Sequence, residues 1–216
     1  MIKYKSMKYD VVIVASGKGQ RANLGYNKAF YRMKDGRTVL ERSLSLFKDD
    51  EDCKNIIVVT SEEYMDEVVS DGKIVKVIGG KQRKDSVYNG LRFVSNEYVM
   101  VHDAVRPFLN KKTLEEVKDK LSDADAVCLG HMATDTVKIV EDGIIKETID
   151  RNKVFMAETP QAFKSDLLKK CFEKCDDKVY TDDASLVEAM GYKVEVVINE
   201  YDNHKLTREE DFIDLW

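Results

Sequence analysis

Residues 11–21 read VVIVASGKGQR, and Lys28 follows seven positions later. The β-branched run that opens this stretch predicts a buried strand. Gly17 and Gly19 behind it leave backbone N–H groups open to an anion, because no Cβ blocks the approach. Arg21 and Lys28 add two positive charges. A strand, an amide-lined turn and two cations together favour a site for a polyphosphate.

Two familiar phosphate-binding motifs fit this loop poorly. A Walker A loop is excluded, because its Gly-x-x-x-x-Gly-Lys-Ser/Thr pattern cannot be laid over the sequence. The dinucleotide-binding fingerprint fits loosely, with Ala22 as its third small residue, but it expects an acidic residue about 20 positions later. The next predicted strand, 55–60, lies too far along the chain and ends without a carboxylate. A tight turn without a ligand remains the alternative interpretation.

The composition is that of a globular protein. The 216 residues are 43% hydrophobic and 35% charged, which suits a single domain over residues 1–216. The net charge of −5 disfavours a nucleic-acid surface, and no apolar run approaches the length of a membrane span. Residues 1–5 lack a signal-peptide core, so we expect a cytoplasmic location. The four cysteines form no Cys-x-x-Cys pair, which predicts reduced thiols rather than structural zinc.

Short apolar runs alternate with amphipathic stretches along most of the chain. Strands are predicted at 10–15, 55–60, 74–78, 98–102, 126–129 and 193–198, and helices at 39–47, 62–69, 86–93, 114–121, 166–172, 183–190 and 208–215. This order predicts an α/β fold, with a mainly parallel, Rossmann-like sheet and helices on both faces. Thr-x-x-Glu patterns beginning at Thr60, Thr113 and Thr207 resemble capping boxes and predict helix starts at those positions.

One segment interrupts this alternation. Residues 136–140 and 144–149 both alternate apolar and polar side chains and are joined by Glu141, Asp142 and Gly143, a pattern typical of a β-hairpin. We therefore expect a protruding β-arm at about 134–156. A two-stranded ribbon is only marginally stable alone, so something must cover its apolar face. A second copy of the chain is the economical candidate.

Polar motifs follow the predicted strands where those strands end. They are GGKQRKDSVYNGL at 79–91, HDAVRP at 102–107, ATDTVK at 133–138, DR at 150–151, TPQ at 159–161, YTDDAS at 180–185 and NHK at 203–205. In open α/β sheets ligands bind beyond the carboxyl ends of the strands. We therefore expect several of these motifs to meet at one site.

In this order and spacing, the motifs from about residue 9 to residue 212 resemble the 2-C-methyl-D-erythritol 4-phosphate cytidylyltransferase family of the non-mevalonate isoprenoid pathway. The resemblance implies an enzyme that transfers CMP from CTP to a polyol phosphate, releases pyrophosphate and uses Mg²⁺. A related family, the ribitol 5-phosphate cytidylyltransferases, is compatible with HDAVRPFL at 102–109, whereas DTVK and TDDAS favour the first family. A non-catalytic nucleotide-binding protein is a third possibility, disfavoured by the retained cations.

The resemblance also implies roles for individual residues. Arg21 and Lys28 would be catalytic, offsetting charge at the α-phosphate and on pyrophosphate. The nucleotide would be bound by Ala15, Ser16, Gly17, Gly19, Gly80, Lys81 and Ser86. The acceptor would be positioned by Asp103, Arg106, Thr136, Arg151 and Lys205, the last two aiming its phosphate. Asp103 would serve the metal, the acceptor hydroxyls or both.

The chemistry agrees with these roles. A phosphate monoester is already an anionic nucleophile, so the reaction needs no strong base, and the task is to bring two polyanions together. Simpler interpretations stay open: Asp103 and Arg106 could form a structural ion pair, and Asp182 could merely cap a helix.

The chain departs from the family pattern at Asn27 and Ala29 (Pro-Lys-Gln is usual), at Ser16 and at Glu158 (glutamine is usual). Asn27 in place of proline predicts a more mobile Lys28 loop. No proposed catalytic cation is lost. In the resembling family the β-arm clasps a second subunit, which implies a homodimer.

Overall fold

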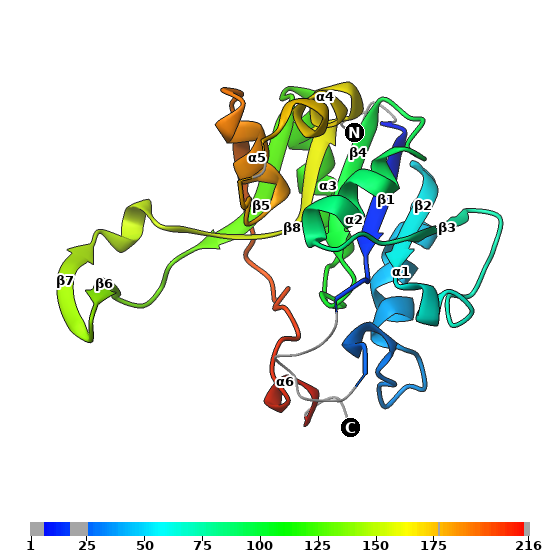
Figure 1. The fold of residues 1–216 in the computed structure, drawn as a ribbon, viewed down its shortest axis with the longest axis horizontal. Coiled ribbons are helices and arrows are strands. Elements are labelled where there is room, and N and C mark those ends of the chain that lie inside the picture. Colours follow the sequence, from blue (N-terminus) through cyan, green and yellow to red (C-terminus); the bar gives the residue numbers. More distant parts are fainter. Residues whose placement is uncertain (1–6, 18–25, 177, 214–216) are drawn as a thin grey trace.

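The computed structural model describes residues 7–17, 26–176 and 178–213. Within them, seven strands form one sheet in the order β3-β2-β1-β4-β8-β5-β9 (Figure 1). The strands are β1 (Tyr9–Val14), β2 (Cys53–Thr60), β3 (Ile74–Ile78), β4 (Tyr98–Asp103), β5 (Ala126–Met132), β8 (Phe155–Lys164) and β9 (Glu195–Ile198). Only β8 runs antiparallel to its neighbours, β4 and β5, so the predicted mainly parallel sheet is confirmed.

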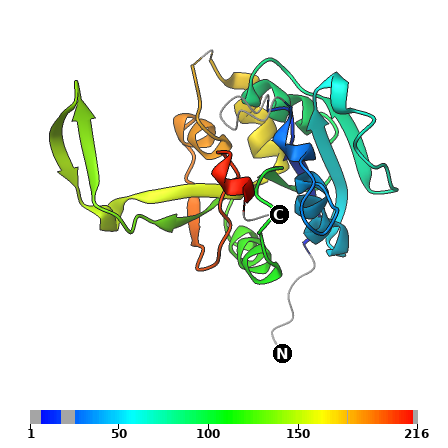
Figure 2. The same ribbon diagram turned by 90° about the horizontal axis from the view of Figure 1, so that it is seen from below.

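Helices cover both faces of the sheet, as predicted (Figures 1 and 2). One face packs against α1 (Val39–Asp49) and α3 (Lys111–Ser122), and the other against α2 (Arg83–Leu91), α4 (Ser165–Lys174) and α5 (Asp183–Ala189). Strand β1 shows why residues 11–14 are all apolar: Val11 and Ile13 belong to the first core, and Val12 belongs to the second. Successive side chains of a strand point to opposite faces, and both faces here are buried.

The structure corrects the sequence interpretation at β8. TPQ was expected to be a loop beyond a strand end, but Thr159, Pro160 and Gln161 are buried inside β8. Proline lacks an N–H and disrupts a strand ladder, and the β5–β8 register shifts at this point, between Cys128 and Gly130. Because proline is typical of loops, Pro160 made this central strand look like a loop in the sequence.

Several predicted helix starts are also wrong. The helix expected at 62–69 is only the 3₁₀ turn η3 (Glu62–Tyr64), and Thr60 is the last residue of β2. Helix α3 begins before Thr113 and is capped by Asn110, and the short α6 (Glu210–Ile213) begins three residues after Thr207. Within the described part of the chain, capping boxes form at the starts of α1, α2 and α5. A Thr-x-x-Glu pattern caps a helix only where tertiary packing begins one.

The β-arm is confirmed. Strands β6 (Val137–Glu141) and β7 (Ile144–Ile149) form an antiparallel pair that projects from the body between β5 and β8 (Figures 1 and 2). Asp142 and Gly143 both have positive φ, as a tight two-residue hairpin turn requires. Large apolar side chains on the arm are exposed: Ile139 (42%), Val140 (56%), Ile144 (61%) and Ile145 (60%). Among the described residues, no helix is both long and apolar enough to cross a membrane.

Candidate active site

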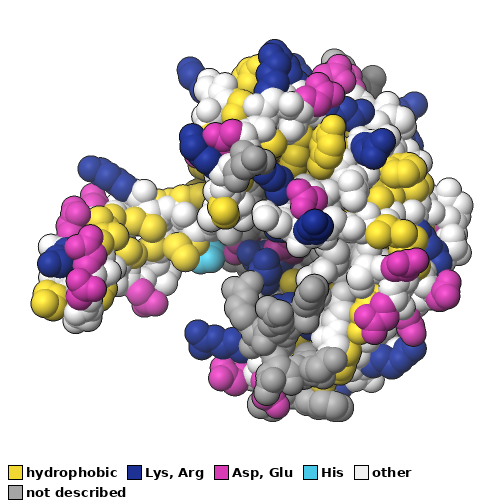
Figure 3. Space-filling view, viewed as in Figure 1, with side chains coloured by type: hydrophobic (Ala, Val, Ile, Leu, Met, Phe, Trp, Pro, Cys, Tyr) yellow, Lys and Arg dark blue, Asp and Glu magenta, His cyan; other side chains and the backbone are white. Residues whose placement is uncertain are grey.

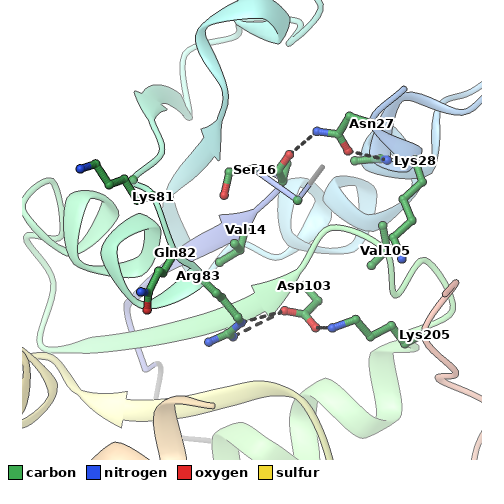
Figure 4. Close-up of a pocket in the computed structure, with 14 residues that line it drawn as sticks. Val14, Ser16, Asn27, Lys28, Lys81, Gln82, Arg83, Asp103, Val105 and Lys205 are labelled. Atoms are coloured by element: carbon green, nitrogen blue, oxygen red, sulfur yellow. Dashed lines mark hydrogen bonds and ion pairs between the residues drawn. The ribbon is translucent and has the colours of Figure 1, made fainter. Parts of the chain in front are cut away.

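A cleft of about 420 Å³ opens beyond the carboxyl ends of β1 and β4. Figure 3 shows a hollow on this face with charged side chains in its floor, and Figure 4 shows the residues that line it. Eight of the predicted site residues line the cleft: Ala15, Ser16, Gly17, Lys28, Gly80, Lys81, Asp103 and Lys205. The 3₁₀ turn η2 (Lys28–Phe30) and the loop before α2 thus lie beside the end of β1.

Two serines fasten the β1 loop to the loop before α2. The Oγ atoms of Ser16 and Ser86 lie 2.8 Å apart, and the backbone N–H of Gly80 donates to Ser86 Oγ at 3.1 Å. Ser86 is fully buried. A Cβ at Gly80 would collide with Asp85, so this close approach requires glycine. These contacts hold two amide-bearing segments on the same side of the cleft.

Asn27 anchors the segment that carries Lys28. Its side-chain amide donates to the backbone oxygen of Ala15, and its backbone N–H donates to the Tyr64 hydroxyl at 3.1 Å. Its side-chain oxygen also accepts from Ala29 N–H at 3.1 Å and caps η2. A proline could make none of these contacts, so the expectation that Asn27 loosens this loop gains no support. Lys28, 9% exposed, donates to the backbone oxygen of Leu206 at 2.7 Å.

Asp103 lies between two cations in the floor of the cleft (Figure 4). Lys205 Nζ lies 2.5 Å from Asp103 Oδ2, and Arg83 Nε lies 3.4 Å from Asp103 Oδ1. Burial alone would raise the pKa of this carboxyl, but the charges of Arg83 and Lys205 outweigh burial and hold its pKa well below the usual range. Asp103 is therefore ionised at neutral pH.

Arg83 was not recognised from the sequence. Besides Asp103, it forms an ion pair with Asp183, its NH2 lying 2.9 Å from Asp183 Oδ2. Lys81, the residue predicted to bind the nucleotide, has an exposed side chain that extends away from this group (Figure 4). A signal was available: residues three apart share a helix face, so a helix starting at Arg83 places Arg83 and Ser86 together.

Two simpler interpretations were left open by the sequence: an ion pair between Asp103 and Arg106, and a helix cap at Asp182. The structure supports only the second. Asp103 pairs with Arg83 and Lys205, whereas Arg106 donates from its NH1 to the backbone oxygen of Asn203 at 2.7 Å. Asp182 does cap α5 by accepting from Ser185 N–H. The neighbouring Asp183 shapes the site through Arg83.

His102 has a structural environment. Its two ring nitrogens lie 3.1 Å from the Arg106 backbone oxygen and 3.1 Å from the Thr159 hydroxyl oxygen. The same hydroxyl accepts from the backbone N–H of Asp103 at 3.0 Å. Complete burial lowers the pKa of His102 to about 4, so the ring is neutral at pH 7.

Other predicted site residues lie elsewhere. Thr136 and Arg151 are exposed on the arm, where Arg151 begins the 3₁₀ turn η4 (Arg151–Lys153) and donates to the Thr134 backbone oxygen at 2.7 Å. Arg106 is half-buried and is not among the residues that line the cleft. Arg21 and Gly19 lie outside the described residues.

The arrangement suits charge stabilisation rather than nucleophilic catalysis. Within residues 7–17, 26–176 and 178–213, no group of three or more His, Cys, Asp or Glu side chains is placed to hold a metal ion. Magnesium needs only one or two protein carboxylates when substrate phosphates supply other ligands. The single ionised carboxylate of Asp103 fits that requirement.

Comparison with known proteins agrees with this geometry. The family model described as 2-C-methyl-D-erythritol 4-phosphate cytidylyltransferase matches residues 9–214. A curated relative of that name from Halalkalibacterium halodurans is 36% identical over 218 residues, covering 96% of this chain and 95% of its own. One from Bacillus mycoides is 37% identical over 215 residues and covers 95% of each chain.

Solved structures show the same likeness. The 4-diphosphocytidyl-2C-methyl-D-erythritol synthase from Anaerococcus prevotii has a TM-score of 0.84 and 31% identity, covering 98% of this chain and 97% of that one. The 2-C-methyl-D-erythritol 4-phosphate cytidylyltransferase from Francisella tularensis has a TM-score of 0.83 and 30% identity, covering 95% and 96%.

Proposed function

The chain belongs to the 2-C-methyl-D-erythritol 4-phosphate cytidylyltransferase family, and from this premise we propose that it transfers CMP from CTP to 2-C-methyl-D-erythritol 4-phosphate and releases pyrophosphate. The observation that carries the proposal is the cleft itself. Its lining brings together the amide-bearing end of β1, Lys28 and the Asp103–Lys205 pair. Such a cleft can hold two anionic substrates with their reacting groups together.

The proposed roles follow from the chemistry of the two substrates. The backbone amides at Ser16 and Gly17 line the triphosphate, and Lys28 with Arg21 offsets charge at the α-phosphate and on the leaving pyrophosphate. Lys205 faces the acceptor phosphate, whose oxygen is already an anionic nucleophile. This chain therefore has to position and neutralise its substrates and has no need to deprotonate the acceptor.

We further propose Mg²⁺ as the cofactor, with Asp103 as the protein carboxylate. The low pKa of Asp103 supports this role, because an ionised carboxylate is available without the loss of a proton. When bound, the ion would neutralise phosphate charge. Because CTP is available in the cytoplasm, we propose that location for the protein.

We also propose that the protein is a homodimer in which the arm of one subunit reaches the cleft of the other. The exposed apolar side chains of β6 and β7 support this proposal, since isolated ribbons need cover. Thr136 and Arg151 support it too, because they lie on the arm and not in the cleft of their own chain. A partner's arm would bring acceptor-binding residues to each site.

One assay tests the reaction. Purified protein is incubated with CTP, Mg²⁺ and either 2-C-methyl-D-erythritol 4-phosphate or ribitol 5-phosphate, and pyrophosphate release is followed. We expect turnover with the methylerythritol acceptor, and omission of the acceptor is the control. Faster turnover with ribitol 5-phosphate would reassign the acceptor. Binding of CTP without turnover of either acceptor would leave a nucleotide-binding protein.

A further inference from the structure

A buried carboxylate behind the cleft has no part in the roles described so far. Glu158, on β8, is 6% exposed, and burying a charge is costly unless polar partners surround it. His131 Nδ1 lies 2.8 Å from Glu158 Oε1, and the side-chain amides of Asn199 and Asn203 donate to Oε2 at 3.0 and 2.9 Å. Three side chains from two other segments thus converge on one carboxylate.

Asn203 connects this carboxylate to Arg106, which bonds to it, and to Lys205, which lies two residues further along the chain. Asn203 is 2% exposed, and its side-chain amide also donates to the Thr159 backbone oxygen at 2.9 Å. Its own backbone oxygen accepts from Arg106 NH1 at 2.7 Å. Among the described residues, Arg106 Nε is buried without a hydrogen-bond partner, so the bond to Asn203 is important for holding the guanidinium.

The same asparagine is two residues from Lys205, whose ammonium group meets Asp103. A lysine side chain has many rotamers, so its position depends on the backbone that carries it. Glu158 accepts from the side chains of Asn199 and Asn203, which lie on the segment that leads to Lys205. Its neighbour Thr159 fixes the other partner, because the Asp103 N–H donates to the Thr159 hydroxyl.

We propose that Glu158 is a positioning residue for the acceptor half of the site, holding Arg106 and Lys205 in place through Asn203. The inference rests on the proposed function and deepens it. It predicts different effects on the two substrates. Loss of Glu158 disturbs the acceptor side of the cleft and leaves intact the nucleotide side, which Ser16 and Ser86 hold together.

Steady-state kinetics of pyrophosphate release test the proposal with three variants. Glu158→Ala is expected to raise the KM for the polyol phosphate roughly tenfold, the effect of losing a hydrogen bond to a charged group, with the KM for CTP unchanged. Glu158→Gln should recover most of the loss, because its oxygen can accept from both asparagines and its amide can lie against the His131 ring nitrogen. The matched control is Glu200→Ala, an exposed glutamate next to Asn199.

A double-mutant cycle tests the route through Asn203. If Glu158 acts through Asn203, then Asn203→Ala reproduces the rise in acceptor KM and the double variant adds little to it. Asn203→Ala also carries the test if Glu158→Ala does not fold, as judged by circular dichroism. Equal rises in both KM values, or an unchanged acceptor KM in an active enzyme, would overturn the inference. Failure of the wild-type protein to turn over either acceptor would instead overturn the proposed function.

Discussion

At the scale of single residues, the cleft works through charges that the protein holds in fixed positions. Asp103 is held between Arg83 and Lys205, and Lys28 is held by the Leu206 backbone oxygen. Fixed charges need little reorganisation when charge develops in a transition state, which is why they are effective in catalysis. The proposed reaction therefore depends strongly on individual cations.

Replacement of Lys28 by alanine tests this dependence. We expect Lys28→Ala to lower kcat by about 10²–10³, the usual result of removing one preorganised group from a transition state. The fold should survive, because Lys28 Nζ donates to the backbone oxygen of Leu206, which belongs to no helix or strand. The control is Lys34→Ala, an exposed lysine on the same segment. Near-normal kcat at saturating CTP would contradict the role given to Lys28.

The buried His102 predicts a pH effect on stability. Its pKa is about 4 in the folded protein and near 6.5 in the unfolded chain, so between these values only the unfolded chain takes up the proton. The contribution of His102 to the free energy of unfolding is therefore fully present above about pH 6.5. It is lost as the pH falls toward 4, by roughly 3 kcal/mol in total.

Urea unfolding of wild type and His102→Gln at pH 7, 6, 5 and 4 measures the effect. The variant is neutral throughout, so the wild-type advantage should shrink as the pH falls. The exposed His204→Gln serves as a control that retains the His102 effect. A difference between wild type and His102→Gln that is independent of pH would show that His102 does not titrate as stated.

At the scale of elements, the insertion of β8 between β4 and β5 shapes the site. It turns a parallel sheet into a mixed one and brings Glu158 and Thr159 behind Asp103. It also carries the chain back from the arm, since β8 follows η4 directly. Strand β5 passes so close to β8 that only glycine fits at one position. A Cβ on Gly130 would collide with the Met156 backbone oxygen and would lie 2.5 Å from the Phe155 ring.

Gly130→Ala should therefore force the two strands apart where the arm leaves the body. We expect a loss of about 1–3 kcal/mol in the free energy of unfolding, because a backbone atom cannot yield as a flexible side chain can. Gly72→Ala is the matched control, since a Cβ there meets open space. Denaturant unfolding of both variants decides the matter, and equal stabilities would show that β5 and β8 can separate without cost.

At the scale of the whole molecule, the arm exposes apolar surface that the body does not cover. Ile139 and Ile145 are 42% and 60% exposed. Exposed apolar surface of this kind is typical of a face that a partner covers. In a two-fold dimer, each arm could contribute to the other subunit's site. Assembly and activity would then be coupled.

The double variant Ile139→Asp, Ile145→Asp tests this coupling. We expect wild type to sediment as a dimer at micromolar concentration and the variant to sediment as a monomer with poor activity, because charged side chains cannot be buried in the interface. Lys146→Asp, an exposed position on the same ribbon, controls for added negative charge. A fully active wild-type monomer in sedimentation equilibrium would exclude the arrangement.

Local pattern by itself determined the layered α/β architecture, the β-arm and the loops that meet at the cleft. The runs 11–14 and 56–59 are apolar on both faces of the sheet. These signals are local, because the period of side-chain direction along a strand or helix decides which residues are buried. Family resemblance added the order of the motifs and the implied roles of Lys28, Asp103 and Lys205.

Tertiary structure alone decided which distant groups meet. It placed β8 in the middle of the sheet despite its proline, and it gave Asp103 the partners Arg83 and Lys205, 20 and 102 residues away. It also placed the Glu158 carboxylate within hydrogen-bond distance of the Asn203 side-chain amide. No periodicity encodes such pairs, because each depends on how whole elements pack, and a buried charge is stable only where that packing supplies its partners.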